Sequence, residues 1–165
     1  MKTKLQSGFT IIELMITLVI AGVLIGVGVP AMTEFLQNER VTSFTNKLLS
    51  DVMYARSKAV ELNIPVVFCA SSDGDSCNSN DYKDGWIVRS APDGDPTQGE
   101  LFRIQDAIDG DIEFKISDEE LSTIAYDSSG FTPDVANGQT ISVYDSRGED
   151  LARTLSFSRT GRVGR

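Results

Sequence analysis

Glu13 is the only charged residue in an apolar run that extends from Phe9 to Met32. An ionised carboxylate near the middle of a lipid bilayer costs about 2.5 to 3.5 kcal/mol, so it requires a partner. Thr10 precedes Glu13 by three residues, which is the spacing of a helix capping box. The helix dipole also favours a carboxylate in the first turn, so local capping is one explanation for this residue.

Two cysteines, Cys69 and Cys77, flank a short polar loop and are the only cysteines in the chain. Disulfides form and persist outside the cytoplasm. The apolar run at 9–32, with Lys2 and Lys4 before it, predicts that both cysteines are exported. We therefore predict a disulfide between them. Closing a loop of this length stabilises the fold by about 2.5 kcal/mol on the chain-entropy model.

A transition-metal site is not expected, because the chain has no histidine and no second cysteine pair. Calcium remains an alternative for the acidic loop that follows Cys69, since hard cations prefer oxygen ligands. The glycine of this loop does not stand where an EF-hand requires it, and acidic turns are usually only solvated. The candidate oxygen ligands are Asp73, Asp75, Asn78 and Asp81.

Basic charge is concentrated at the C-terminus. The whole chain has a formal charge of −9, which argues against general affinity for nucleic acid, but residues 147–165 carry a local +3. Arg159, Arg162 and Arg165 are separated by glycines and could contact phosphates without base specificity. No aromatic residue lies among them in the sequence to stack on bases. The alternative is a basic terminus that aids solubility or meets an acidic neighbouring subunit.

Enzymatic chemistry is not expected from these residues. The chain has no histidine, its cysteines are expected to be oxidised, and it contains neither a Gly-x-Ser-x-Gly sequence nor a glycine-rich phosphate-binding loop. We therefore predict a protein that is not an enzyme and that needs no cofactor.

The run from Phe9 to Met32 is long enough to cross a membrane. As a helix, its 24 residues would extend for about 36 Å, against about 30 Å of hydrocarbon. Lys2 and Lys4 would hold the N-terminal end in the cytoplasm, so the rest of the chain would be exported.

An amphipathic helix is predicted to continue this segment to Leu62, with a kink at Pro30 and an end at Asn63 and Pro65. Charged residues, including Asp51 and Arg56, occupy other positions around the helix. One apolar stripe at intervals of three or four is expected to face a core: Val41, Phe44, Leu48, Val52, Ala55, Ala59 and Leu62.

From Ile64 onward, short apolar or alternating runs separated by turn residues predict about six or seven strands, mostly antiparallel. A sheet of such strands would cover the apolar stripe of the helix, which gives an α+β fold. The runs we assign to strands are 64–70, 86–88, 101–104, 112–116, 140–144 and 154–157.

The segment Gly8-Phe-Thr-Ile-Ile-Glu13 resembles the prepilin peptidase site of type IV pilins and type II secretion pseudopilins. Three further segments are similar to the FimT/GspH group of minor pilins and pseudopilins: Ala55-Arg-Ser-Lys-Ala59-Val, the strand and Cys-containing loop that precede Asp84-Gly85-Trp86, and Ser158-Arg-Thr-Gly-Arg-Val163. This resemblance covers most of the chain and implies a pilin-like fold.

The resemblance also implies how the N-terminus is used. Cleavage after Gly8 would leave Phe9 as a methylated N-terminal residue, and Glu13 would pair with the amino group of Phe9 on a neighbouring subunit. Four segments then follow: a leader peptide at 1–8, a transmembrane helix at 9–32, its amphipathic continuation at 33–63 and an exported β-rich domain at 64–165.

Two functions are compatible with this group. A FimT-like protein would serve a type IV pilus and could bind DNA for natural transformation through a C-terminal Gly-Arg-x-Arg, from which Gly161-Arg-Val-Gly-Arg165 departs by one inserted residue. A GspH-like protein would belong to the tip of a type II secretion pseudopilus. An ordinary single-pass membrane protein with an exported β domain, its N-terminus uncleaved, is the third possibility.

Either filament implies the same location and similar partners. The protein would cross the bacterial inner membrane once, with its globular domain in the periplasm, and would lie at the filament tip when assembled. Its partners would be prepilin peptidase, the inner-membrane assembly platform, and other major and minor pilins or pseudopilins.

Overall fold

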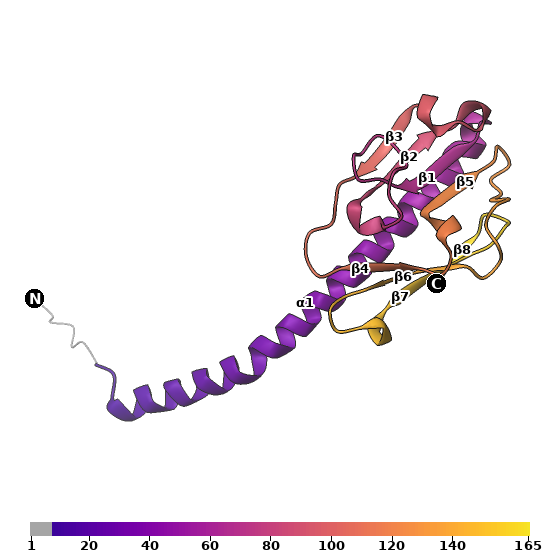
Figure 1. Ribbon diagram of the computed structural model, residues 1–165. Helices are drawn as coiled ribbons and strands as arrows, with labels where there is room; N and C mark the ends of the chain where they lie inside the picture. Colours follow the sequence, from indigo (N-terminus) through magenta and orange to yellow (C-terminus); the bar gives the residue numbers. More distant parts are fainter. Residues whose placement is uncertain (1–7) are drawn as a thin grey trace, which may run out of the picture. The chain divides into compact units, whose positions relative to one another are not determined.

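The computed structural model describes residues 8–165, so Lys2, Lys4 and most of the predicted leader peptide lie outside the described residues. The chain divides into two compact units, Met1–Asn38 and Glu39–Arg165, and Figure 1 labels the helix and strands. The first unit is helical where it is described. The second combines the end of the same helix with eight strands.

Helix α1 extends from Ile11 to Leu62. Its first turn is capped by Thr10, whose Oγ1 accepts the backbone N–H of Glu13 at 3.2 Å. The helix ends before Asn63, which adopts the left-handed conformation with φ 55° that is common just beyond a helix C-terminus. The predicted end is therefore confirmed. The helix assignment passes through Pro30 without a break, and the kink there stays a prediction.

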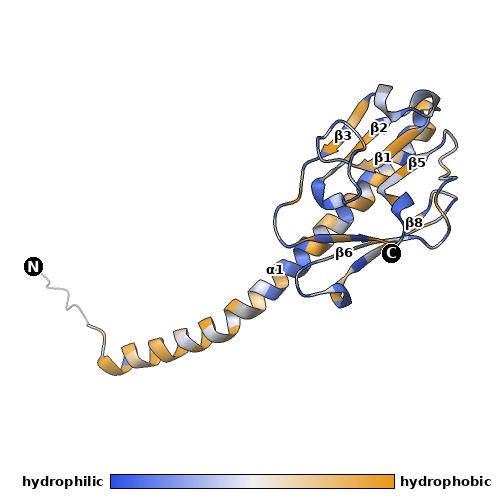
Figure 2. Cartoon of the chain, viewed as in Figure 1, coloured by the Kyte–Doolittle hydropathy of each residue, from blue (hydrophilic) through white to orange (hydrophobic). Residues whose placement is uncertain are grey.

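The N-terminal part of α1 is long and apolar enough to cross a membrane. Its most apolar 18-residue window has a mean hydropathy of 2.5. Apolar residues occupy most positions of this part of the helix (Figure 2), and their side chains are exposed. A helix that is apolar all round requires either a lipid or a protein environment.

The second unit, Glu39–Arg165, which we call the exported unit because the sequence predicts its export, contains two antiparallel sheets. The first has the strand order β3-β2-β1-β5, and the second has the order β4-β6-β7-β8. In the first sheet, β1 is Val66–Ala70, β2 is Trp86–Ser90, β3 is Leu101–Gln105 and β5 is Thr123–Tyr126. In the second, β4 is Glu113–Ile116, β6 is Thr140–Tyr144, β7 is Arg153–Phe157 and β8 is Val163–Gly164.

Five 3-10 helices lie in the connections between strands of the exported unit. They are Tyr82–Asp84, Pro92–Gly94, Pro96–Gln98, Glu119–Ser122 and Glu149–Leu151. Several begin with an aspartate that accepts a backbone N–H two residues on; Asp81, for example, accepts from Lys83. Such capping is why acidic residues are common in these turns.

One hydrophobic core joins residues 41–59 of α1 to both sheets. The α+β fold and the helix stripe are thereby confirmed, because five of the seven predicted stripe residues are buried and Phe44 is half-buried. Leu62 was expected to face the core and is instead 41% exposed, since it lies at the very end of the helix.

Asp51 is the clearest correction to the helical wheel. It was expected on the polar side of α1, yet it is only 7% exposed. Its carboxylate accepts the indole N–H of Trp86 at 2.9 Å and pairs with Arg103 at 2.6 Å. Arg103 in turn stacks on the ring of Tyr54, 3.7 Å from its centroid. The carboxylate is buried because partners distant in sequence satisfy it.

The sequence identified six of the eight strands and predicted one sheet rather than two. Strand β5 has only four residues, too few for a clear alternating pattern, and it forms by pairing with β1. Strand β8 has only two residues and pairs with β7. Both strands therefore depend on tertiary partners that local sequence does not reveal.

Candidate functional site

The segment for which the sequence predicts processing, Gly8–Phe9, lies directly before the first turn of α1. Phe9 is 86% exposed, and among the described residues no atom beyond the chain neighbours of Gly8 lies within 4 Å of the position that a Cβ would take at Gly8. The bond between these residues is therefore sterically accessible. Thr10 caps the helix through the backbone of Glu13, which leaves the exposed carboxylate of Glu13 available for another partner.

The disulfide between Cys69 and Cys77 is present, which confirms that prediction. Cys69 is buried at the first sheet, beside Val67, Ile87 and Ala91. The bond therefore fixes an otherwise polar loop to the sheet.

Asp73 organises the loop that the disulfide closes. Its two carboxylate oxygens accept hydrogen bonds from Ser71, Asp75, Ser76 and Asn78. The hydroxyl and N–H of Ser76, together with the N–H of Asp75, hold the pKa of the Asp73 carboxyl well below its usual range. Both oxygens are thus engaged by donors of the loop itself. Within residues 8–165, no three histidine, cysteine, aspartate or glutamate side chains gather as a metal site would require.

The C-terminal arginines are carried by residues 153–165, which we call the arginine hairpin. Strand β7 leads into a tight turn at Ser158–Gly161, closed by a hydrogen bond from the Gly161 N–H to the Ser158 carbonyl at 2.9 Å. Arg159, Arg162 and Arg165 are all exposed. The basic C-terminus is therefore an ordered hairpin and not an extended tail.

Arg56 of α1 fastens this hairpin to the exported unit. Its Nε donates to the carbonyl of Gly130 at 3.0 Å, and its Nη2 donates to the carbonyl of Thr160 at 3.1 Å. Thr132 adds two more bonds: its N–H donates to the carbonyl of Arg159 and its hydroxyl to that of Ser158, each at 3.0 Å. The sequence predicted only that Arg56 lies off the apolar stripe of the helix and gave no sign of this role.

Gly161 makes the close approach possible. Its φ of +72° is left-handed, and a Cβ there would lie 2.0 Å from the carbonyl oxygen of Gly130. Only glycine fits such a position without a backbone shift. The glycine of the terminal Gly-Arg segment is therefore needed to seat the turn against the 127–132 loop.

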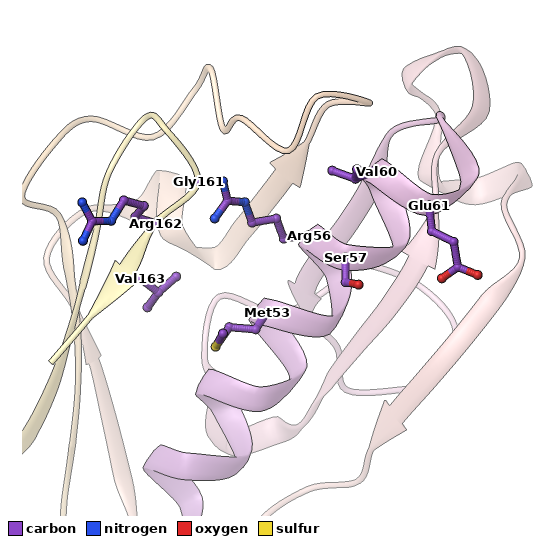
Figure 3. Close-up of a pocket in the computed structure, with 8 residues that line it drawn as sticks. All are labelled: Met53, Arg56, Ser57, Val60, Glu61, Gly161, Arg162 and Val163. Atoms are coloured by element: carbon purple, nitrogen blue, oxygen red, sulfur yellow. The ribbon is translucent and has the colours of Figure 1, made fainter.

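The three predicted arginines do not share one pocket. Arg162 lines an open groove beside α1 with Met53, Arg56 and Val60 (Figure 3). Arg165 instead lines a second hollow with Arg153. Of the described carboxylates, none forms an ion pair with Arg153, Arg159, Arg162 or Arg165, so all four positive charges are open to an outside partner.

The structure also brings an aromatic residue near the hairpin. Phe131 is 47% exposed, and its neighbour Thr132 is hydrogen-bonded to Arg159. The sequence shows no aromatic residue among the arginines because Phe131 is separated from them by strands β6 and β7.

The fold and the site together define the pilin class of proteins. A long helix starts with an apolar segment directly after an accessible Gly8–Phe9 bond, and antiparallel sheets pack on the other end of the helix. Residues 45–161 match the family model of type II transport protein GspH, and residues 3–29 match the prokaryotic N-terminal methylation motif. The chain therefore belongs to the GspH family.

Solved structures give the same fold. The type IV minor pilin FimU of Pseudomonas aeruginosa superposes in one crystal form with a TM-score of 0.64 and 18% identity, covering 79% of this chain and 90% of FimU. A second crystal form of FimU gives a TM-score of 0.60 and 20% identity, covering 74% and 90%. At these identities the likeness establishes the fold alone. None of the curated protein sequences compared with this chain matches it.

Proposed function

We propose that this chain is a minor subunit of a type IV pilus. In this proposal, prepilin peptidase cleaves after Gly8, Phe9 becomes the methylated N-terminus, and residues 9–32 anchor the protein in the bacterial inner membrane with residues 64–165 in the periplasm. The methylation motif at residues 3–29, which coincides with an exposed Gly8–Phe9 segment directly before an apolar helix, supports the processing and the anchor. The observation that favours a pilus over a secretion pseudopilus is the cluster of exposed arginines at the C-terminus.

Glu13 would then act in assembly. Cleavage creates an amino group on Phe9, and the carboxylate of Glu13 on a neighbouring subunit would neutralise it inside the apolar environment. A charge in lipid requires such a partner. Capping by Thr10 is compatible with this role because it uses only the backbone N–H of Glu13.

Intact mass and N-terminal sequencing of the protein purified from membranes test the processing. We expect a chain that begins at Phe9 and carries one methyl group, and a chain that retains residues 1–8 in cells without prepilin peptidase. Gly8→Val should block cleavage in the same way, since it places a branched side chain at the cleavage position. A mature protein that begins at Met1 in cells with the peptidase would contradict the proposal and favour an ordinary single-pass membrane protein.

A type II secretion pseudopilus is the second candidate, and the match of residues 45–161 to the GspH model favours it. The filament tip is the proposed position in either assembly. Crosslinking of the mature protein in its native membrane separates the two candidates: crosslinks to pilus subunits would support the pilus, and crosslinks to secretion pseudopilins would support the alternative.

Within the pilus proposal, the arginine hairpin is a candidate DNA-binding element. Two observations support this role. The arginines of the hairpin are exposed, and none of them forms an ion pair with a described carboxylate, although the chain has a net charge of −9. Such contacts would be to phosphates and would weaken steeply with salt.

A mobility-shift assay with the full chain in detergent micelles tests DNA binding at the hairpin. We expect the triple variant R159Q, R162Q and R165Q to bind DNA at least about tenfold more weakly at low salt and to flatten the salt dependence, because up to three phosphate contacts are lost. A matched triple variant, R40Q, K47Q and K115Q, removes the same charge elsewhere on the exported unit. Equal losses in the two variants, or no binding at low salt, would rule out the hairpin as the DNA site.

A further inference from the structure

Helix α1 and the arginine hairpin enclose an open groove, which we call the hairpin groove. Met53, Arg56 and Val60 line it from the helix, and Gly161, Arg162 and Val163 line it from the hairpin. In Figure 3, Met53 projects from α1 toward the strand that carries Val163. The groove is bounded by two elements that Arg56 holds together, so its walls are fixed by the fold.

Two large apolar side chains of α1 are exposed at the groove. Met53 and Val60 are 58% and 54% exposed and lie two turns apart on α1, whereas most of their exposed neighbours are polar. The loop that follows β5 approaches this surface, since a Cβ at Gly130 would lie 3.0 Å from the side chain of Val60. Exposed methionine beside arginine is typical of the composition of protein interfaces.

One wall of the groove is a sheet edge. Strand β8 is the last strand of its sheet, and the Ser158 N–H donates to the Arg162 carbonyl at 3.1 Å. Ser158 and Arg162 therefore form a hydrogen-bonded pair. Such pairs alternate with non-hydrogen-bonded pairs along an antiparallel ladder, so the next pair, Phe157 and Val163, is non-hydrogen-bonded. The N–H and C=O of Val163 consequently point away from β7, where they can pair with an added strand.

The charge of the groove is positive. Arg56 and Arg162 contribute guanidinium groups, and Arg162 forms no ion pair with a described carboxylate. Glu61 also lines the groove, but it pairs with Lys58 at 2.9 Å and is directed away from the hairpin in Figure 3. A complementary partner must therefore supply a carboxylate opposite Arg162.

We propose that the hairpin groove binds an extended acidic segment of a neighbouring filament subunit. The segment adds a strand to β8 at Val163, places an apolar side chain against Met53 and Val60, and presents a carboxylate to Arg162. The identity of the partner as a filament subunit rests on the proposed function, whereas the strand-adding chemistry rests on the groove. Nucleic acid would use the arginines but neither the apolar surface nor the strand edge.

Binding of three probes to the full chain in detergent micelles tests the proposal. They are a peptide of alternating Val and Glu, a peptide of the same length with alternating Val and Lys, and a single-stranded DNA oligonucleotide, each followed by fluorescence anisotropy. We expect the Val/Glu peptide to bind, the Val/Lys peptide to fail, and hydrogen exchange at the Val163 amide to slow when the acidic peptide is added. Neither measurement depends on cleavage after Gly8, so peptide binding can fail even if the processing test succeeds, and the reverse.

Two variants with a matched control locate the binding. Met53→Glu should weaken binding of the acidic peptide about tenfold, because it replaces the apolar contact with a repelling charge. Ile104→Glu, at a position on β3 that is 52% exposed, should leave binding unchanged. Arg162→Glu should reverse the preference toward the Val/Lys peptide. Binding of the oligonucleotide alone, binding of no probe, or equal effects of Met53→Glu and Ile104→Glu would overturn the proposal.

Discussion

Replacement of Gly161 by alanine is expected to lower the free energy of unfolding of the exported unit by about 3 kcal/mol. Two costs combine. The left-handed φ of +72° strains any residue with a Cβ, and the added methyl group would lie 2.0 Å from the carbonyl oxygen of Gly130. That oxygen belongs to the backbone and also accepts the hydrogen bond from Arg56. It therefore cannot move without weakening the hydrogen bonds that hold the hairpin.

Gly138→Ala is the matched control for this prediction. Gly138 also has a left-handed φ, +88°, but open space surrounds the position of its Cβ. It should therefore cost only the conformational strain, about 1 kcal/mol. Urea unfolding of the full chain in detergent micelles, followed by the fluorescence of Trp86, measures both, because Trp86 is the only tryptophan and lies in the core. Equal losses would show that the turn does not depend on its contact with the 127–132 loop.

Replacement of Asp51 by alanine is expected to destabilise the exported unit by a similar amount, about 3 kcal/mol. The buried indole N–H of Trp86 would lose its acceptor, and Arg103 would lose its ion-pair partner. Asp51→Asn should cost less, because an amide oxygen can still accept from the indole while the charge pair with Arg103 is lost. The side chain of Arg103 is 40% exposed, so its guanidinium can still be solvated.

Glu149→Ala is the control for the Asp51 prediction, since Glu149 pairs with Lys115 at 2.8 Å on the surface. An exposed pair contributes less than about 1 kcal/mol, so this variant should be nearly neutral. The same unfolding measurement compares the two, and the emission of Trp86 should shift in Asp51→Ala because its hydrogen bond is gone. If Asp51→Ala proved no more destabilising than Glu149→Ala, the buried cluster would have no structural role.

The helix and most strands could be predicted because their signals are local. The apolar stripe of α1 has the period of a helix, and Asn63 with Pro65 gives a conventional helix end. The six predicted strands have either an alternating or a continuously apolar pattern between turn residues. Strand β1 is buried along its whole length, as its apolar run suggested. Strands β5 and β8 lacked such signals because pairing with β1 and β7 defines them.

The candidate site was only partly predictable. Arg159, Arg162 and Arg165 are visible in the sequence as a basic cluster, but the features that order them are distant. Arg56 lies on a helix and the 127–132 loop follows β5, yet both are bonded to the same turn. Hydrogen bonds between segments this far apart leave no periodic pattern in a sequence.

The sequence alone therefore determined the processing motif at Gly8 and Phe9, the apolar helix with its single charge at Glu13, and the cysteine pair. Each of these features consists of residues that are close together along the chain, so hydropathy, spacing and helix geometry are enough to identify it. The tertiary structure alone decided that Asp51 is buried against Trp86, that Arg56 fastens the arginine hairpin, and that Met53 and Val60 share a groove with Arg162. Those outcomes depend on which distant groups satisfy a buried or partly buried polar atom, and only the packed fold fixes that choice.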